Sequence, residues 1–159
     1  MKIKLEIDSN PPEGSTYELK YLDFPLAYSV QAQDLSSLFA GKIHALLCRE
    51  YVKGRDWYDF IWYISQKTPV NFLFLENVLK QTDHSADRKL KISLDWLIAQ
   101  LTTKINTINW TQAKQDIARF LKPQELSTLD LWTADFFISR VDKLKAYVGG
   151  LAVFDKLIS

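Results

Sequence analysis

One stretch of this 159-residue sequence gathers side chains that could bind and process phosphate groups. It contains four cations and a pair of aspartates. Cations can neutralise a phosphate chain, and carboxylates can hold divalent metal ions or position a nucleophile. The stretch therefore favours phosphate-directed chemistry, and the alternative is a capped helix with a solvated basic turn. The six residues are Lys42, Arg49, Lys53, Arg55, Asp56 and Asp59.

Lys42 falls inside the apolar stripe of a predicted helix. Asp34 is a good N-cap residue, and the positions after it recur with the spacing of an amphipathic helix. A lysine in such a stripe must reach water or find a carboxylate. We therefore expect its ammonium near Asp56 or Asp59, at the rim of a cleft. The apolar positions are Leu35, Leu38, Phe39, Ile43, Leu46 and Leu47.

A second predicted helix begins at Gly54-Arg55-Asp56, with Asp56 as N-cap and Asp59 at its third position. Both carboxylates would then face the positive end of the helix. The three cations that precede or open this helix should converge there, where backbone amides also attract anions. A phosphate site is expected from Arg49, Lys53 and Arg55.

These residues also carry a resemblance to a known family. Ala40-Gly-Lys42-Ile-His-Ala-Leu and Lys53-Gly-Arg-Asp56-Trp-Tyr-Asp59 resemble the A-x-K-h-x-A-L … R-D-x-Y-D signature (h apolar) of AbiEii/AbiGii-type toxin nucleotidyltransferases. That family belongs to the DNA polymerase beta-like nucleotidyltransferase superfamily. The resemblance implies catalytic roles for Lys42, Asp56 and Asp59. It also implies Mg²⁺, a nucleoside triphosphate, an RNA acceptor such as tRNA, and an antitoxin partner.

The first residues alternate between apolar and polar side chains, which predicts a strand over Lys2–Asp8. Its polar face carries Glu6 and Asp8, and the simpler interpretation is a solvated face balanced by lysines. In the resembled family a strand of this kind supplies a metal-binding carboxylate. By that resemblance, Glu6 is the expected metal ligand, beside the cleft of Lys42.

Two earlier motifs of the resembled family, a glycine-serine turn and D-x-D-F, have no convincing counterpart here. No two aspartates in the sequence are separated by a single residue. The segments Gly14–Leu19 and Leu22–Phe24 fit these motifs superficially, but they follow the Glu6 strand and leave no room for a helix between them. The chain thus resembles the C-terminal part of such an enzyme, expected to be inactive alone. It would pair through its strand edge with a completing N-terminal chain or with a second copy.

The patterns predict an α+β fold that is mostly helical, within a single domain over 1–159. Residues 1–31 would form two or three strands, 34–66 the helical hairpin, and 70–159 the remaining helices of a total of five or six, with the Lys42 helix packed across the sheet. The expected strands after the first are Tyr17–Tyr21 and Leu26–Gln31. The expected later helices are Phe72–Lys80 capped by Asn71, Asp87–Ile105, one from Thr111 with Ile117, Phe120 and Leu121 buried, and one from Asp130 or Thr133 to Gly149-Gly150.

Composition narrows the functional classes. Hydrophobic residues make up 47% of the chain and its net charge is +1, so a folded core is expected and any nucleic-acid binding must be local. The single Cys48 excludes an internal disulfide and favours a cytoplasmic setting. No apolar run is long enough to cross a membrane. Two alternatives to an enzyme remain open, a non-catalytic binding module with a basic phosphate-binding turn and a truncated remnant.

Overall fold

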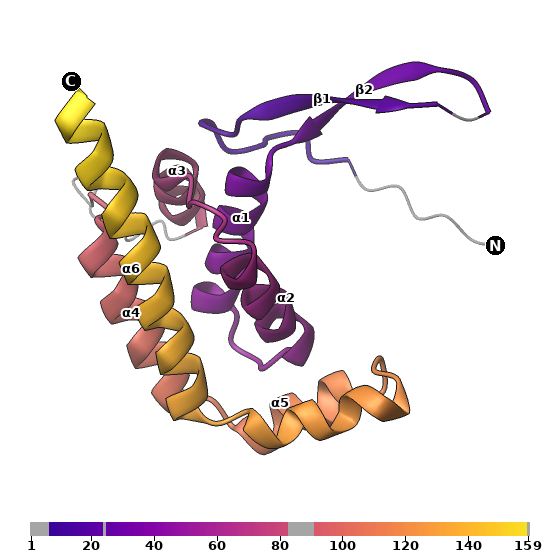
Figure 1. The fold of residues 1–159 in the computed structure, drawn as a ribbon, viewed down its shortest axis with the longest axis vertical. Coiled ribbons are helices and arrows are strands. Elements are labelled where there is room, and N and C mark those ends of the chain that lie inside the picture. Colours follow the sequence, from indigo (N-terminus) through magenta and orange to yellow (C-terminus); the bar gives the residue numbers. More distant parts are fainter. Residues whose placement is uncertain (1–6, 24, 83–90, 159) are drawn as a thin grey trace.

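Helices dominate the computed structural model, which describes residues 7–23, 25–82 and 91–158. Figure 1 shows a β-hairpin at one end of a helical body. This arrangement confirms the predicted α+β, mostly helical class with two strands and six α-helices among the described residues. The elements are β1 (Tyr17–Leu22), β2 (Tyr28–Gln33), α1 (Leu35–Cys48), α2 (Gly54–Ser65), α3 (Phe72–Thr82), α4 (Leu94–Thr107), α5 (Trp110–Ala118), the 3-10 helix η1 (Pro123–Leu131) and α6 (Ala134–Ile158).

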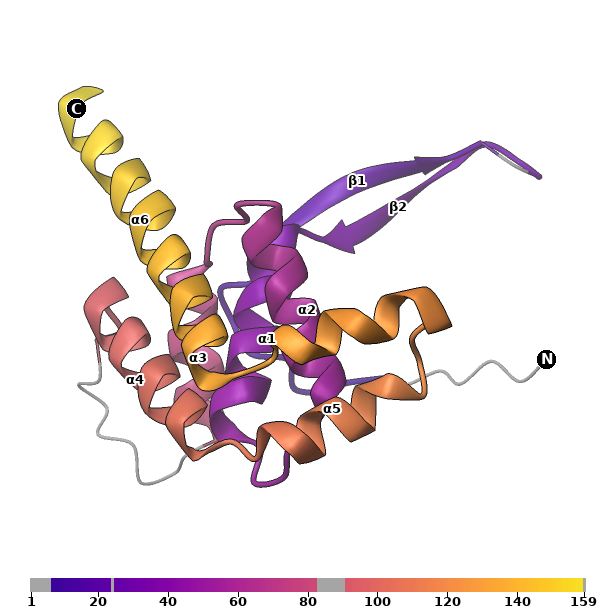
Figure 2. The ribbon, with the colours of Figure 1, turned by 60° about the horizontal axis from the view of Figure 1, so that its bottom comes forward.

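The two strands pair antiparallel, from Tyr17 opposite Gln33 to Leu22 opposite Tyr28. The hairpin projects away from the helices in Figures 1 and 2, and its large side chains are mostly exposed. The expectation that the Lys42 helix packs across the sheet is therefore wrong: α1 packs on α2, α3 and α4 instead. Of the strand expected over Lys2–Asp8, residues 2–6 lie outside the described residues, and Ile7 and Asp8 are not in a strand.

A polar junction fixes the hairpin to the helices. The Asp34 carboxylate accepts hydrogen bonds from the Ser37 amide at 2.8 Å and from the Thr16 hydroxyl at 2.5 Å, so Asp34 caps α1 as predicted. The Asn71 side-chain amide donates to the Gly14 carbonyl at 2.8 Å, and its oxygen accepts from the Phe74 amide at 3.0 Å, which caps α3. Hydrogen bonds thus hold the base of the hairpin to the helices, whereas the rest of the hairpin is solvated.

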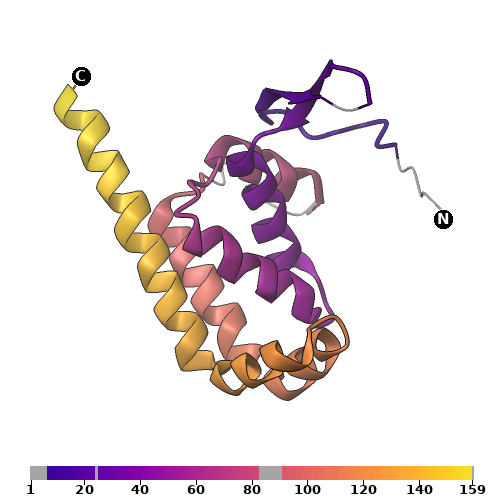
Figure 3. The same ribbon diagram turned by 45° about the vertical axis from the view of Figure 1, so that its right-hand side comes forward.

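Apolar and aromatic packing joins the helices. The Trp57 ring lies 5.2 Å from the Trp110 ring and 5.2 Å from the Phe137 ring, which links α2, α5 and α6. Phe39 stacks on Tyr63 at 4.7 Å and so joins α1 to α2. Figure 3 shows α4 and α6 side by side, with α5 and η1 near the start of α2. This core fixes α1, α2 and α5 relative to one another.

Two helix boundaries differ from the predictions. Of the helix expected from Asp87, residues 87–90 lie outside the described residues and 91–93 are not helical. The helix α4 begins at Leu94, where the Ser93 hydroxyl caps it by accepting from the Trp96 amide at 3.1 Å. The last helix begins after Thr133, as one of the two predicted starts, but continues past Gly149-Gly150 to Ile158. Glycine inside a helix costs only about 1 kcal/mol, so two glycines do not have to end it. No described helix combines the length and apolarity that crossing a bilayer would require.

Candidate functional site

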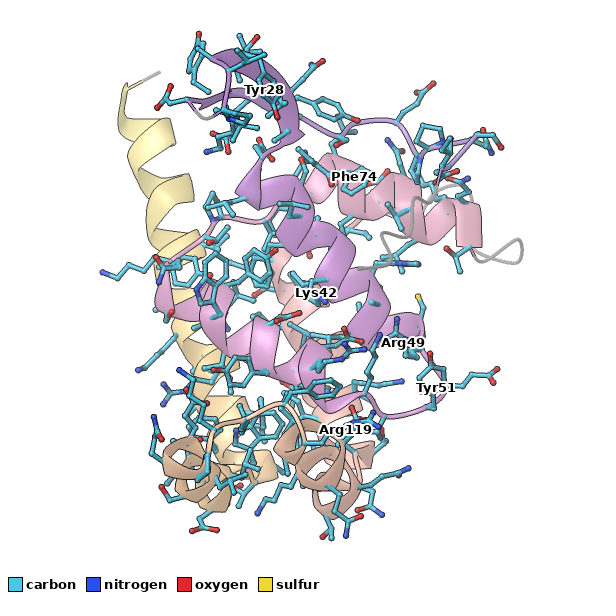
Figure 4. All side chains as sticks on the ribbon, turned by 90° about the vertical axis from the view of Figure 1, so that its right-hand side faces the viewer. Tyr28, Lys42, Arg49, Tyr51, Phe74 and Arg119 are labelled. Atoms are coloured by element: carbon cyan, nitrogen blue, oxygen red, sulfur yellow. The ribbon has the colours of Figure 1, made fainter. Side chains whose placement is uncertain are left out.

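Lys42 reaches across from α1 to α2 and contacts both predicted aspartates. Its Nζ lies 3.0 Å from Asp56 Oδ1 and 2.8 Å from Asp59 Oδ2. Figure 4 shows Lys42 in the space between the two helices. The Asp56 side chain is only 7% exposed, whereas that of Asp59 is 46% exposed. The predicted proximity of Lys42 to this acidic pair is confirmed, and only one of the two carboxylates is accessible to solvent.

Arg49 holds the second oxygen of Asp56, because its guanidinium pairs with Oδ2 while Lys42 takes Oδ1. The buried carboxylate is thus balanced by two cations of α1 and its C-cap. Asp56 is not the N-cap of α2, as the sequence had suggested: α2 begins at Gly54, and the Asp56 amide donates to the Lys53 carbonyl at 3.0 Å. Its carboxylate turns toward α1 because two cations lie there.

The first amide of α2 is already occupied by a carboxylate from α5. The Gly54 amide donates to Asp116 Oδ2 at 2.9 Å, and the other oxygen of Asp116 accepts from Arg119 at 2.7 Å. Glycine is required at this point because a Cβ on Gly54 would collide with the carbonyl oxygen of Ala113. The expectation that this amide is open to an external anion is therefore wrong, and a phosphate here would meet side chains.

Five of the six predicted residues line one cleft of about 520 Å³ between α2 and α5. Arg49 is the exception. It contacts Asp56 from outside the cleft, and its guanidinium lies 5.3 Å from the ring centre of Tyr51. Figure 4 labels both Arg49 and Tyr51. Glu6 lies outside the described residues. The cleft is lined by Lys42, Lys53, Arg55, Asp56, Tyr58, Asp59, Ile117, Phe120, Leu121 and Glu125.

The opposite wall of the cleft comes from α5 and the residues after it, which sequence reasoning missed. Phe120 was expected to be buried but is 51% exposed, and the guanidinium of Arg55 lies 4.7 Å from its ring centre. Glu125 lines the same wall and accepts a hydrogen bond from the Lys122 amide at 2.8 Å. The only sequence signal was indirect: Phe120 lies three residues after the buried Ile117, close to the end of its helix.

The electrostatics of the cleft keep Lys42 charged. Burial pushes the pKa of Lys42 down, but hydrogen bonds and charge attraction from Asp59 and Asp56 outweigh it, so the pKa is raised above its ordinary 10.5. Burial also raises the pKa of the nearby Tyr63 hydroxyl. At neutral pH Lys42 is an ammonium, so it can neutralise an anion but cannot accept a proton.

The carboxylates of the cleft do not by themselves form a magnesium site, and Glu6, the metal ligand that the resemblance implies, lies outside the described residues. A magnesium ion requires several oxygen ligands at about 2.0 to 2.1 Å. Both oxygens of Asp56 are engaged by cations, and one oxygen of Asp59 is engaged by Lys42. Among the described residues, no group of three or more His, Cys, Asp or Glu side chains could hold a metal ion. We therefore derive no metal-dependent step from this cleft.

Comparison with family models gives a match over most of the chain. A family model described as nucleotidyl transferase AbiEii toxin, type IV toxin–antitoxin system, matches residues 1–140. No curated protein and no solved structure matches the chain. The matched range includes the whole α1–α2 unit, the cleft and the first part of α6.

Proposed function

The chain belongs to the AbiEii family of nucleotidyl transferase toxins of type IV toxin–antitoxin systems, and we propose that its cleft binds the phosphates of a nucleoside triphosphate. The observation that carries this proposal is the position of Lys42, held between Asp56 and Asp59 on a cleft that also contains Lys53 and Arg55. Preorganised cations in a partly enclosed site stabilise the charge that develops on transferring phosphates.

The contacts support different roles for the three residues that the resemblance marks as catalytic. Asp56 is buried and positions Lys42, because Arg49 fixes its other oxygen. Lys42 remains an ammonium and would neutralise the phosphate nearest to the aspartates. Asp59 is the accessible carboxylate, and we assign it to orient the acceptor hydroxyl. Lys53 and Arg55 would neutralise the remaining phosphates at the mouth of the cleft.

We further propose that the acceptor is RNA and that this chain alone does not transfer nucleotides to it. Phosphoryl transfer of this kind usually depends on divalent ions that clamp the attacking and leaving oxygens. The described carboxylates do not form such a clamp, and the sequence has no D-x-D pair to supply one. Losing the clamp costs several kcal/mol, and each 1.36 kcal/mol lowers the rate about tenfold.

The exposed hairpin supports a partner that completes the catalytic part. β1 and β2 each leave one edge without a strand neighbour among the described residues, and large side chains such as Tyr21 and Leu19 face solvent. Free sheet edges readily pair with another strand. We propose a completing chain that carries the missing carboxylates; an antitoxin is a separate partner expected for a toxin of this family.

Triphosphate binding is the direct test of the cleft. We expect weak, salt-sensitive binding of ATP and GTP to the purified chain, measured by isothermal titration calorimetry. A Lys53→Gln, Arg55→Gln double variant should bind at least about tenfold more weakly, because each lost charge contact removes on the order of 1 kcal/mol. The matched control is Lys145→Gln, which removes one exposed charge from α6, away from the cleft. Equal binding by the double variant and the control would overturn the proposed phosphate site.

Nucleotide transfer is the test of dependence on a partner. The purified chain is incubated with labelled nucleoside triphosphates, magnesium and total tRNA, and we expect no incorporation. Robust incorporation that disappears in Lys42→Ala would contradict the proposed inactivity and would show a metal site that the described residues do not form. Intact triphosphate binding together with no incorporation is also the result expected of a non-catalytic module. Incorporation on addition of a chain bearing D-x-D would separate these two functions.

A further inference from the structure

Three hollows follow one another along the exposed side of α2. The first is the cleft already described, which includes Tyr58. The second, of about 320 Å³, is also lined by Tyr58 and extends to Ile61 and Ser65. The third, of about 420 Å³, is lined by the same Ile61 and Ser65 and continues to α6. Because neighbouring hollows share lining residues, they form one row along the helix, which we call the α2 groove.

The middle of the α2 groove has an aromatic surface. Tyr58 and Trp62 are exposed on α2, and Leu131 and Phe136 form the opposite wall. None of the residues lining this hollow is charged. The flat faces of nucleobases stack on exposed aromatic side chains with little dependence on sequence. An apolar hollow of this kind between two charged ones is therefore suited to unpaired bases.

The far end of the α2 groove is basic. Lys67, Arg140 and Lys143 line it, and none of its lining residues is acidic. Among the described residues these three cations form no salt bridge, whereas Lys42 at the other end pairs with Asp56 and Asp59. The Arg140 guanidinium lies 4.7 Å from the ring centre of Phe136, next to the aromatic hollow. These cations are thus available to an external anion.

The basic end is also rigidly built. The Tyr147 hydroxyl on α6 donates to the Thr68 carbonyl at 2.9 Å, which ties α6 to the chain leaving α2. Lys67 adopts a left-handed backbone with φ of 51°, directly after Gln66, the C-cap residue of α2. The groove spans α2 from Arg55 to Ser65, about 15 Å at 1.5 Å per residue. Its two ends are therefore held at a fixed separation.

We propose that the α2 groove binds the single-stranded end of the RNA acceptor. The phosphates contact Arg140, Lys143 and Lys67, the bases stack over Tyr58 and Trp62, and the terminal hydroxyl enters the cleft beside Asp59. This inference rests on the proposed function, because it gives the second substrate of that reaction a path to the triphosphate. Charge favours RNA over an apolar protein segment, since the far end of the groove carries three cations and no carboxylate, and the middle hollow has no charged residue.

The test is fluorescence anisotropy with a labelled 12-nucleotide single-stranded RNA and a duplex of the same sequence. The Arg140→Gln, Lys143→Gln double variant should bind the single strand at least about tenfold more weakly. The slope of log affinity against log salt concentration should become less steep by about 1.4, which is about 0.7 for each of the two lost phosphate contacts. Trp62→Ala should weaken binding at least about fivefold with an unchanged salt slope, because stacking carries no counterions.

Lys145→Gln is the control on α6, since Lys145 lies two residues from Lys143 but points toward Asp95 of α4, 3.9 Å away. It should bind RNA within about twofold of the unchanged chain. Thermal melting followed by circular dichroism checks that each variant folds. Three results would overturn the inference: no RNA binding by the unchanged chain, equal losses in the double variant and the control, or tighter binding of the duplex.

ATP binding distinguishes a failure of the proposed RNA path from a failure of the proposed triphosphate cleft. Because the double variant keeps Lys53 and Arg55, it should bind ATP as the unchanged chain does. Normal ATP binding with no groove-dependent RNA binding would overturn the α2 groove alone and would favour a protein partner on this surface. Loss of ATP binding in the Lys53→Gln, Arg55→Gln variant with RNA binding retained would support the cleft and the other two hollows of the groove as separate subsites. No change of ATP binding in that variant would overturn the proposed cleft itself.

Discussion

The β-hairpin and the α1–α2 unit are neighbours in the chain but are built in opposite ways. The hairpin exposes large side chains on both faces, for example Tyr21 at 72%, and is held to the helices mainly at its base. The α1–α2 unit buries Phe39 and Phe60 completely and fixes even its charges, with Lys42 between two aspartates. The first region lacks a layer to pack against, whereas the second is covered by α3, α4 and α5.

This difference shows that a sequence pattern can predict a helix or strand without predicting whether its apolar face is buried. Both regions show clear periodicity in sequence, a period of two in the strands and of 3.6 in the helices. In α1–α2 the apolar stripe meets other helices, so pattern and burial agree. In the hairpin the same kind of pattern meets solvent. Its exposed apolar side chains support the partner proposed above, because small folded proteins seldom leave many large side chains exposed together.

The largest expected contrast is between two aromatic truncations. Phe39→Ala removes a fully buried ring from the core and should lower the free energy of unfolding by about 3–5 kcal/mol. Tyr21→Ala removes an exposed ring from β1 and should change it by no more than about 0.5 kcal/mol. Urea denaturation followed by circular dichroism measures both. A Tyr21 effect near that of Phe39 would mean that the hairpin is covered in solution, as pairing between two copies would produce.

The next contrast compares two carboxylates that each contact lysine. Asp56→Ala leaves Lys42 with one carboxylate partner and Arg49 with none, although both side chains are only about a quarter exposed, and should destabilise by about 3 kcal/mol. Glu18→Ala removes the exposed 2.8 Å pair with Lys20 in the hairpin, worth at most about 1 kcal/mol. The same urea experiment measures both. A small Asp56 effect would show that water reaches Arg49 and Lys42 freely and that the network does not hold α1 to α2.

The sequence predicted those parts that depend on residues close together in the chain. The Asp34 cap, the position of Lys42 near Asp56 or Asp59, and the two strands follow from spacing within one or two elements. It did not predict the contacts that only the assembled fold creates. Asp116 reaches the start of α2 from 62 positions away, and it takes the amide that the sequence had offered to an anion.

Two further errors have the same origin. Phe120 continues the apolar spacing of α5, but the helix ends at Ala118 and the ring then faces the cleft. Arg49 belongs to the same basic segment as Lys53, yet the carboxylate of Asp56 draws it to the other side of α2. In each case the residue type was recognised correctly and its direction was decided by a long-range neighbour. Sequence reasoning therefore located the site but not its walls.

A smaller effect is expected at the junction between the two regions. Asp34→Ala removes the N-cap of α1 and the 2.5 Å contact with Thr16, and should destabilise by about 1 kcal/mol. Burial raises the pKa of Asp34, but hydrogen bonds from Thr16, Ser37 and Ser36 outweigh it and lower the pKa below its ordinary 3.8. This stabilisation is present above the unfolded pKa and is lost as pH falls through the folded pKa.

The pH dependence of stability tests whether the Asp34 carboxylate is the stabilising group. The stability difference between the unchanged chain and Asp34→Ala should be constant near pH 6–7 and should shrink as the solution is acidified below about pH 4. Asp34→Asn, which keeps an oxygen acceptor for the Ser37 amide, should retain most of the stability and show no such acid loss. A difference that stays constant through the acid range would mean that the Asp34 carboxylate is not the stabilising group.

A small stability effect is also expected at Lys42, which contacts both aspartates of the cleft. Lys42→Met keeps an unbranched stem within the apolar stripe of α1, leaves Asp56 paired with Arg49, and leaves the half-exposed Asp59 to water. The free energy of unfolding should therefore change by less than about 1 kcal/mol, in either direction. Because the pKa of Lys42 is raised, its stabilising contribution is complete below its unfolded value near 10.5 and is lost as pH rises through the folded value. The stability of Lys42→Met should therefore rise relative to that of the unchanged chain only in strong alkali.

ATP binding by Lys42→Met, in contrast, should weaken several-fold, because a charge has left the cleft. A small change in stability together with weaker ATP binding would mean that Lys42 is retained for its charge and not for the fold. A loss of stability above about 2 kcal/mol with ATP binding unchanged would instead make Lys42 part of a structural ion pair.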